Sequence, residues 1–316
     1  MSDVLLPFQA ALLEEVKLGL EETRLGRNSI GILLLGESGT GKTHAADLLV
    51  DLFRPYRDGV QMMTPCLRLD ANAIGGKESV PSAGLSQLGR QVRPRQSGLE
   101  SMFMDAVMQQ RVQLLVLEEF HNRLLSGKSD FRSAQGEFLK NLWNCTPKNS
   151  VSNWSNPNPH SSPRKLVIVV SGTPILLEAF RGNPELDSRF TVVIEAKPLG
   201  MFPNEEFRLF RQLMRAFAER FSLGELVNPD DNELAARCFF ACEAHLRKLE
   251  KIFARVAAIV RHQHDEPDIG AIFTTAWAKE MKGAGPNPFV LSKAELNALV
   301  AKELKRFQTR TGGKNA

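Results

Sequence analysis

The chain has 316 residues, a length that fits one large or two modest domains. Hydrophobic residues make up 43% of it, which is enough for a sizeable core and excludes a disordered chain. The net charge of +4 permits nucleic-acid binding without establishing it. No stretch reaches about 18 uncharged apolar residues, and the N-terminus Met1-Ser2-Asp3 lacks the basic start of a secretory signal. We therefore expect a cytoplasmic protein with no membrane partner.

The first part of the chain alternates helical patterns with short apolar runs. Helices are predicted over 4–25, 43–53, 98–111, 133–143 and 174–181, and strands over 30–35, 61–69, 112–117, 166–170 and 192–195. The stretches 71–97 and 145–164 are rich in Gly, Ser, Pro or Asn and are expected to be loops. Because the strands are apolar throughout, the pattern predicts an α/β fold with a parallel sheet covered by helices on both faces.

The second part of the chain shows only helical periodicity. It runs from about Pro203 to Lys282 and ends in a Gly/Pro break, after which Ser292 is placed to cap a final helix that fades into a basic tail. Cys238 and Cys242 lie four residues apart on one of these helices, and we expect two reduced, buried thiols. The predicted domains are 1–200 for the α/β core, 201–283 for a smaller helical lid, and 284–316 for a C-terminal helix and tail.

A phosphate-binding loop lies between the first predicted strand and the helix that follows it. Its pattern is G-x-x-x-x-G-K-T, in the strand–loop–helix context that the motif requires. Its glycines let backbone N–H groups face phosphates at a helix N-terminus. Lys42 is expected to reach the β- and γ-phosphates of ATP, and the Thr43 hydroxyl to ligate Mg²⁺. The nucleotide-binding residues predicted here are Gly36, Glu37, Ser38, Gly39, Thr40, Gly41, Lys42, Thr43 and His44.

Two acidic residues end the strand predicted over 112–117. A P-loop enzyme needs a carboxylate at the end of a neighbouring strand to hold the magnesium shell, and Glu118 takes that position. Glu119 is placed to polarise the attacking water. The alternative is a pair of solvated acids at a strand end. Most relatives would carry Asp at the first position, so the longer Glu118 side chain is expected to shift the metal geometry and slow turnover.

Four segments resemble the TniB/TnsC transposition ATPases and the initiator-type AAA+ proteins related to them. EEFHN (Glu118–Asn122) resembles the "DE-hydrophobic-HN" signature, and VSGTP (Val170–Pro174) resembles the "SGTP" strand end that carries the first sensor. PELDSRF (Pro184–Phe190) resembles the "L-x-S-R-F" box. HLRKLE (His245–Glu250) is a weaker match to the second-sensor helix. The resemblance covers roughly residues 10 to 260 and implies an AAA+ P-loop fold followed by a helical lid.

The resemblance also implies roles for single residues. Ser171 or Thr173 would hydrogen-bond the γ-phosphate or the attacking water, unless its polar group only satisfies a strand end. Arg189 would act on the ATP of a neighbouring subunit, with a surface salt bridge as the alternative. Arg247 would sense nucleotide from the lid, or else lie on a solvated helix face. His121 and Asn122 either relay the nucleotide state to the DNA side or cap the next turn.

An arginine that acts between subunits implies an oligomer, and the resembled family forms rings or helical filaments around double-stranded DNA. The stretch 71–97 follows the strand after which initiator-type proteins place DNA-contacting elements. Its basic residues are the predicted phosphate contacts: Lys77, Arg90, Arg93 and Arg95. A solvated loop is the alternative, and the basic loop 148–165 and the tail after Lys302 are further candidates.

Three functions remain open from the sequence. The first is a regulator of DNA transposition that binds ATP and Mg²⁺, oligomerises on DNA and links a transposase to a target-selecting, TniQ-like partner, with hydrolysis driving disassembly. The second is a replication initiator or helicase loader, although the residues after 288 are too few for a helix-turn-helix domain. The third is a scaffold that binds ATP and barely hydrolyses it, as Glu118 suggests.

Overall fold

The structure is a computed structural model that describes residues 4–74, 79–92, 97–125, 129–144, 165–262, 268–281 and 285–312. The chain divides into two compact units. The N-terminal unit is Pro7–Ala196, and the helical unit is Lys197–Ala316 together with Met1–Leu6. The residues after 284, predicted as a separate segment, are thus grouped with the helical unit. Within the described part of the chain, no helix combines the length and apolar character that a membrane crossing requires.

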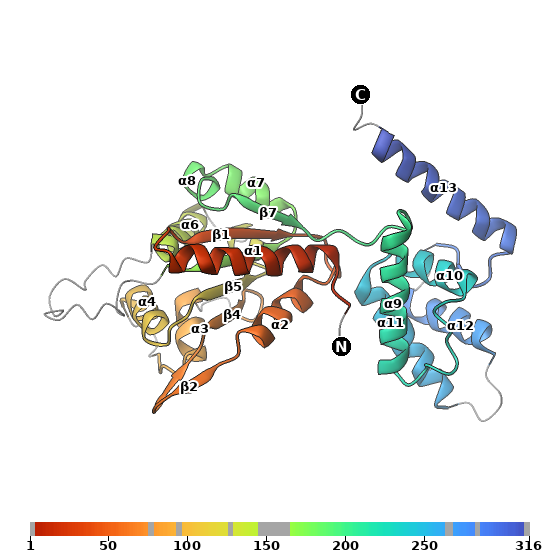
Figure 1. The fold of residues 1–316 in the computed structure, drawn as a ribbon, viewed down its shortest axis with the longest axis horizontal. Coiled ribbons are helices and arrows are strands. Elements are labelled where there is room, and N and C mark those ends of the chain that lie inside the picture. The colour runs from red at the N-terminus through yellow and green to blue at the C-terminus, as the bar shows by residue number, and fades with distance from the viewer. Residues whose placement is uncertain are drawn as a thin grey trace, which may run out of the picture. The chain divides into compact units, whose positions relative to one another are not determined.

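The N-terminal unit is built on a parallel sheet (Figure 1). Among the described residues its strand order is β4-β5-β6-β1-β7, and each neighbouring pair runs in the same direction. The strands are β1 (Ile30–Leu35), β4 (Cys66–Asp70), β5 (Leu114–Glu118), β6 (Val167–Gly172) and β7 (Val192–Glu195). Because parallel strands all end at one edge, the residues that follow β1, β5 and β6 are gathered there. The expected α/β fold is confirmed.

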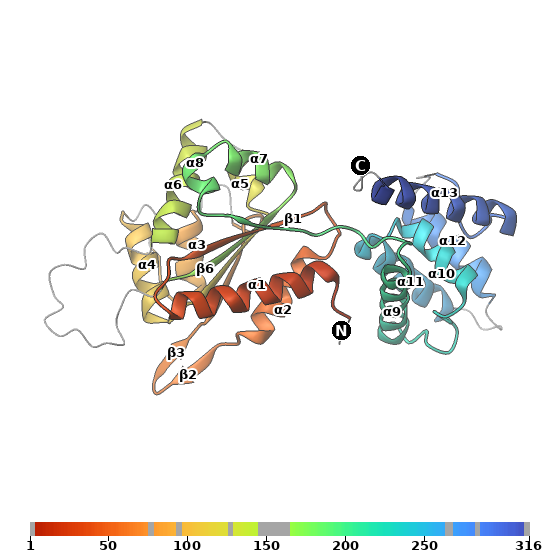
Figure 2. The ribbon, with the colours of Figure 1, turned by 45° about the horizontal axis from the view of Figure 1, so that its top comes forward.

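Helices cover both faces of this sheet (Figure 2). The helices α1 (Pro7–Arg24) and α2 (Lys42–Leu52) pack on one face. The opposite side carries α3 (Val80–Gln87), α4 (Leu99–Gln109), α5 (His121–Leu125), α6 (Ser129–Asn144), α7 (Ile175–Arg181) and α8 (Pro184–Asp187). With both faces covered, the inner strands β5 and β6 are buried along their whole length, which is why they consist mainly of Leu, Ile and Val and do not alternate with polar residues.

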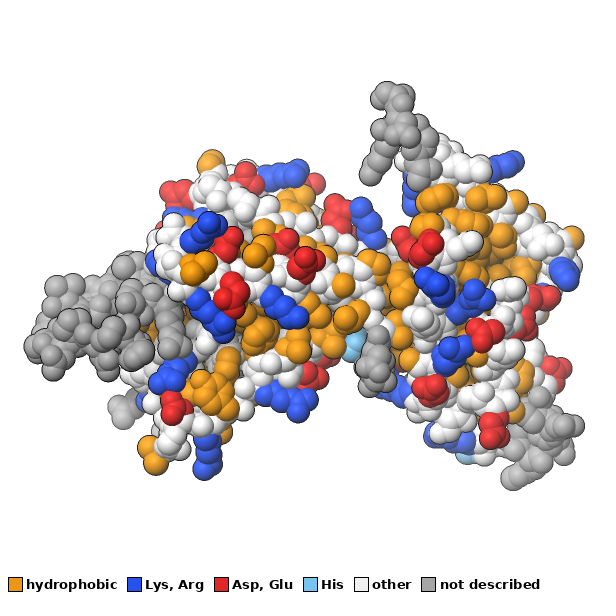
Figure 3. All heavy atoms as spheres, in the orientation of Figure 1, with side chains coloured by type: hydrophobic (Ala, Val, Ile, Leu, Met, Phe, Trp, Pro, Cys, Tyr) orange, Lys and Arg blue, Asp and Glu red, His pale blue; other side chains and the backbone are white. Residues whose placement is uncertain are grey.

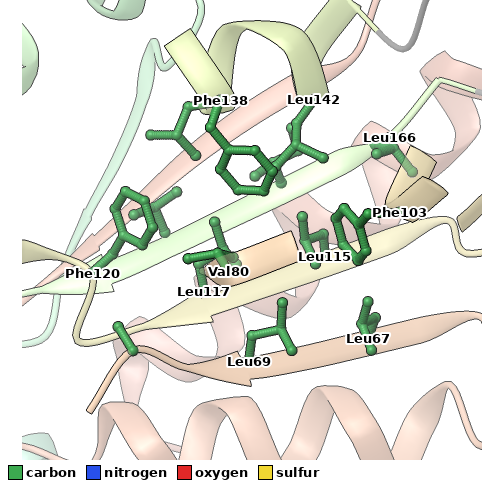
Figure 4. Packing of buried hydrophobic residues seen from close by; sticks show 14 of the residues in the cluster. Leu67, Leu69, Val80, Phe103, Leu115, Leu117, Phe120, Phe138, Leu142 and Leu166 are labelled. Carbon is green, nitrogen blue, oxygen red and sulfur yellow. The ribbon is translucent and has the colours of Figure 1, made fainter. Parts of the chain in front are cut away.

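A hydrophobic core lies between the sheet and the helices on the second face (Figure 4). Leu115 and Leu117 point from β5 toward Phe103 of α4 and Phe138 of α6 (Figure 4). Phe103 is fully buried, and its ring lies 6.2 Å from that of Phe138. Gly84 of α3 fits directly against this ring, since a Cβ at Gly84 would lie 2.2 Å from a carbon of Phe103. The Phe103 ring therefore joins α3, α4 and α6 on the sheet.

Replacing Phe103 with alanine is expected to lower the free energy of unfolding of the N-terminal unit by about 3–5 kcal/mol, because it leaves a cavity that the packed helices fill only in part. Urea denaturation followed by circular dichroism measures this loss. Replacing the exposed Leu18 on α1 with alanine is the control and should change the unfolding free energy by less than about 0.5 kcal/mol. Equal effects of the two substitutions would contradict the central place of Phe103.

Two predicted elements differ from the structure. The strand predicted over 61–69 is two strands, since β3 (Gln61–Met63) pairs antiparallel with β2 (Tyr56–Asp58) and only β4 joins the main sheet. The break falls at Pro65, which has no N–H to donate and instead accepts bonds from Gln113 and Leu114 at 2.9 Å. The loop predicted over 71–97 contains α3. Ser79 caps this helix by accepting a bond from the Ser82 N–H at 3.3 Å.

The helical unit contains α9 (Asn204–Arg220), α10 (Asn232–Cys242), α11 (Leu246–Val260), α12 (Ile269–Met281) and α13 (Lys293–Gly312). Ser292 begins α13 with a capping box, in which the Glu295 N–H donates to Ser292 Oγ at 3.3 Å and the Ser292 N–H donates to Glu295 Oε2 at 2.8 Å. The predicted cap is confirmed.

Hydrophobic side chains gather over α13 and α10 on the face in view (Figure 3). A groove of about 810 Å³ lies between α9, α10 and α13.

Cys238 and Cys242 are free, buried thiols on α10, as expected. Burial raises the pKa of the Cys242 thiol to about 12 and that of Cys238 well above its usual value. Both side chains therefore stay protonated and act as apolar packing groups.

Candidate nucleotide site

The loop Gly36–Thr43 connects β1 to α2 at the carboxyl edge of the sheet. Gly39 and Gly41 have φ values of 87° and 100°, in the left-handed region that favours glycine. Gly41 is also the N-cap of α2, and no side chain caps that helix. Its first N–H groups therefore face the loop, where the helix dipole favours an anion. Gly36 lies against Ala196, because a Cβ there would come within 2.5 Å of the Ala196 carbonyl oxygen.

Lys42 is buried in the centre of the loop. Its ammonium group donates to the carbonyl oxygens of Gly36 at 2.7 Å and Glu37 at 3.0 Å. Glu119 Oε1 lies 3.8 Å from the same nitrogen. These contacts place a desolvated positive charge where the loop curves around the N-terminus of α2, which is the position from which a lysine contacts the phosphates of a bound nucleotide.

Glu118 is buried at the end of β5, one strand beyond β6 from the P-loop strand. Burial raises the pKa of its carboxyl group, and this rise is opposed by hydrogen bonds from Arg68 and from the Thr43 side chain. Arg68 also pairs with Asp47 of α2, so one guanidinium group lies between two carboxylates. The Thr43–Glu118 contact brings together the two residues predicted as metal ligands. Arg68 was not predicted to belong to the site.

Glu119 sits in a tight turn after β5. Its φ is 50°, a backbone conformation that residues other than glycine seldom adopt. The turn is held by the fully buried Phe120, whose N–H donates to the Ser171 carbonyl oxygen at 3.0 Å. His121 Nδ1 lies 3.5 Å from Glu119 Oε2. The Glu119 carboxylate is thus positioned between Lys42 and His121, at the carboxyl edge of the sheet where the P-loop follows β1.

The Ser171 hydroxyl is buried at the end of β6 and has no hydrogen-bond partner among the described residues. Ser171 pairs with Leu34 in the sheet, so β6 lies beside the P-loop strand, as predicted. A buried hydroxyl without a partner is costly and rare in folded proteins. A hydroxyl placed at the end of the strand beside the P-loop strand could donate to an anion, and the sensor role of Ser171 stays a prediction.

Arg189 follows α8 and lies at the opposite edge of the sheet from its own P-loop. A Cβ on Gly31, at the amino end of β1, would come within 2.7 Å of the Arg189 carbonyl oxygen. The P-loop begins five residues further along β1, about 16 Å away at the rise of a strand. The side chain stacks over Trp143 at 5.3 Å, and Nη1 lies 3.6 Å from Glu185 Oε2. An arginine side chain cannot span that distance to the phosphates of its own subunit.

The other predicted residues are placed differently. Arg247 lies in the helical unit, exposed on α11. Arg90 donates to Gln109 at the end of α4. Asn122 donates to Asn72 at 2.7 Å, and its neighbour Arg123 donates to the carbonyl of Ile74, so the turn after β5 is tied to the residues after β4. Lys77, Arg93 and Arg95 lie outside the described residues, as does nearly all of the basic loop 148–165.

The residues present fit a nucleotide with a magnesium ion. The open N-terminus of α2 and Lys42 suit phosphates, while the Thr43 hydroxyl and the Glu118 carboxylate supply the oxygen ligands that Mg²⁺ prefers. Within the described residues no cluster of three or more His, Cys, Asp or Glu side chains could hold a metal by itself. A metal here would take further oxygens from phosphates and water, which is usual for Mg²⁺ in nucleotide sites.

Residues 27–180 match a family described as AAA domain. These residues include the P-loop, Glu118, Glu119 and Ser171. No curated protein matches the chain. The fold is similar to the solved structure of the ORC2 protein of Aeropyrum pernix in its ADPNP-ADP complexes, with a TM-score of 0.63 and 13% identity over 93% of this chain and 71% of that one. It is also similar to the ORC1 protein of Aeropyrum pernix in complex with DNA, with a TM-score of 0.57 and 16% identity over 89% and 67%. At these identities the likeness is one of fold.

Proposed function

We propose that the AAA domain over residues 27–180 binds ATP with Mg²⁺ and hydrolyses it slowly. The observation that carries this proposal is the convergence at one edge of the sheet of Lys42, the acids Glu118 and Glu119 at the end of β5, and the Ser171 hydroxyl, which has no partner among the described residues. Thr43 and Glu118 would hold the Mg²⁺, which would offset the negative charge of the phosphates. Lys42 and the first N–H groups of α2 hold the phosphates, Glu119 orients the attacking water, and Ser171 donates to the γ-phosphate or that water.

We further propose that nucleotide binding controls assembly of the chain on double-stranded DNA. Arg189 cannot reach its own P-loop, so the site needs a second subunit to be complete. The bonds from Asn122 to Asn72 and from Arg123 to Ile74 join the nucleotide site to the segment whose sequence carries Lys77, Arg90, Arg93 and Arg95. The similar ORC1 structure is a complex with DNA, which adds support.

Replacing Arg90, Arg93 and Arg95 together with glutamine is expected to weaken DNA binding and to lower the salt slope of the binding constant by about 0.9 for each phosphate that is no longer neutralised. Binding of a fluorescent duplex, measured by anisotropy between about 50 and 200 mM salt in the presence of an ATP analogue, gives this slope. The control is the triple change of Lys17, Arg24 and Arg27 to glutamine around α1, which removes the same charge. An unchanged salt slope in the Arg90, Arg93 and Arg95 variant would indicate that the loop 148–165 or the tail after Lys302 contacts the DNA instead.

The finer function proposed is regulation of transposition, in which the DNA-bound oligomer links a transposase to a TniQ-like target-selecting protein. The support is the resemblance of Glu118–Asn122 and Val170–Pro174 to the transposition ATPases. Electron microscopy with duplex DNA and a non-hydrolysable ATP analogue tests it. A regular protein coat that binds a TniQ-like protein is the expected result. A single ring that instead binds a replicative helicase would favour the initiator or loader, which remains the alternative.

A scaffold that binds ATP and hydrolyses it very little is the second candidate. The reason is that Arg68 is paired with Glu118, the carboxylate that a hydrolysing site uses to bind metal. Phosphate release from the wild type and from Glu118→Asp discriminates between the two. Phosphate release by either form supports the proposed hydrolysis and nucleotide-controlled assembly. Intact ATP binding with no phosphate release by either form supports the scaffold.

A further inference from the structure

Arg68 forms an ion-pair bridge between two elements of the nucleotide site. It lies on β4 opposite Val116 of β5, so its side chain reaches Glu118 at the end of β5. The same guanidinium reaches Asp47, which lies four residues after Thr43 on α2. A planar guanidinium group can hold two carboxylates at once because it carries donors on several edges. The bridge therefore connects β4, β5 and the helix that begins at the P-loop.

The two carboxylates in this bridge differ in their surroundings. Glu118 is buried and also accepts a hydrogen bond from the Thr43 side chain. Asp47 is half exposed, with 51% of its side-chain surface accessible, and Arg68 itself is 27% accessible. The guanidinium group can therefore turn away from Glu118 toward solvent and still keep Asp47 as its partner. Glu118 cannot leave in the same way, because the end of β5 fixes it.

We propose that Arg68 competes with Mg²⁺ for the Glu118 carboxylate, and that Asp47 holds the guanidinium group when Glu118 binds the metal. This inference rests on the proposed binding of nucleotide and Mg²⁺ at this site and concerns its regulation. Two cations cannot share one buried carboxylate at hydrogen-bond distance without strong repulsion. Binding of Mg²⁺ is thus coupled to movement of Arg68. The free Mg²⁺ concentration that half-saturates the site is therefore higher than the nucleotide alone would require. At low free Mg²⁺ Arg68 stays paired with Glu118, and the site binds nucleotide without hydrolysing it.

A purely structural bridge makes a different prediction from a competitor. Removing either end of a structural bridge loosens α2 against the sheet, so both changes would shift nucleotide binding in the same direction. If Arg68 competes with the metal, the two ends have opposite effects. Loss of Arg68 frees Glu118 for the metal, whereas loss of the Asp47 charge leaves Arg68 with Glu118 as its one remaining partner in the bridge.

The test is a Mg²⁺ titration of the binding of a fluorescent ATP analogue to the full chain. In Arg68→Gln the half-saturating free Mg²⁺ concentration should fall about tenfold, the size expected for loss of one partly exposed ion pair. In Asp47→Asn it should rise several-fold. Arg57→Gln, on the exposed strand β2, removes the same charge as Arg68→Gln and should leave the value unchanged. Arg68→Lys keeps a cation without the planar fork and should lie between the wild type and Arg68→Gln.

Two further measurements accompany the titration. Circular dichroism checks the folding of each variant, and electron paramagnetic resonance measures Mn²⁺ binding to the protein without nucleotide. Arg68→Gln should bind Mn²⁺ more tightly than the wild type, which a structural bridge would not produce. Equal or parallel shifts in Arg68→Gln and Asp47→Asn would overturn the inference while leaving nucleotide binding intact. A wild-type chain that binds no nucleotide at any Mg²⁺ concentration would instead refute the proposed function. If Arg68→Gln does not fold, Arg68→Lys and Asp47→Asn still have to diverge.

Discussion

Replacing Lys42 with alanine is expected to lower ATP affinity about 100-fold or more and to abolish ATP-dependent binding to DNA. The ammonium group is buried, with the carbonyl oxygens of Gly36 and Glu37 as its fixed partners, and it is aimed into the loop. Its charge-assisted bonds to phosphates are worth about 1.5–3 kcal/mol each, and two of them account for that loss. Isothermal titration with ATP measures the affinity, and filter binding of duplex DNA with and without ATP measures the dependence.

The matching control is Lys17→Ala, which removes an equal charge from an exposed position on α1 and should leave both measurements unchanged. Because Lys42 also satisfies two loop carbonyls, the melting temperature of Lys42→Ala has to be recorded beside the binding data. A folded Lys42→Ala protein that still binds DNA in an ATP-dependent manner would contradict the assembly switch.

The strands that carry the site were predictable because each consists of an unbroken apolar run. Ile30–Leu35 reads as a buried strand that ends in glycine, and the structure confirms it residue for residue. The apolar run after Lys165 likewise predicts β6 and places Ser171 at its end. A parallel sheet buried on both faces imposes this composition on each inner strand, so the local sequence carries the information.

The elements that were missed depend on contacts made far along the chain. Val80–Gln87 contains Gly, Ser and Pro and has little helical periodicity, yet it forms α3 because Val80 and Leu85 are buried in the core. Gly84, which weakens a helix in isolation, is required there by the ring of Phe103. Tertiary packing thus overrides the local preference.

Arg68 was missed at the site for the same reason. Its partner Glu118 lies 50 residues away, and the pair forms because β4 and β5 are neighbours in a particular register. The resemblance implies an Asp at the position of Glu118, and an altered metal site was predicted from that departure. The Arg68–Glu118 ion pair could not be predicted with it, because the pair depends on the register between β4 and β5.

Glu119 shows how the fold and the chemistry depend on each other. Its positive φ is held in place by burial of the next residue, Phe120, and by the bond from the Phe120 N–H to β6. The same bond joins the turn to Ser171, whose hydroxyl has no partner among the described residues. A nucleotide that engages Ser171 therefore acts on the strand that fixes Glu119. The Phe120–Ser171 bond thus connects the end of β6 to the turn, and the Asn122–Asn72 bond connects the turn to the residues after β4.

Replacing Arg189 with alanine is expected to lower the rate of ATP hydrolysis by about 10³-fold while leaving the ATP affinity of the monomer unchanged. The reason is geometric, since Arg189 lies at the amino edge of the sheet and its own P-loop at the carboxyl edge. Its stacking on Trp143 and its contact with Glu185 orient the guanidinium group within its own subunit. Phosphate release on DNA and nucleotide titration of the dilute protein are the two measurements. Arg181→Ala, on the exposed end of α7, is the control.

A mixing experiment separates action between subunits from a structural role of Arg189. Glu119→Gln keeps Arg189 but lacks the carboxylate that orients water, and Arg189→Ala keeps the carboxylate but lacks the arginine. Each variant alone should be inactive. In a mixture, an Arg189→Ala subunit can receive the arginine of a Glu119→Gln neighbour, so part of the wild-type rate should return. Because neither subunit has a complete site of its own, recovery requires that the site be shared. No recovery from two folded, DNA-bound variants, or a fall in monomer affinity equal to the fall in rate, would refute the shared site.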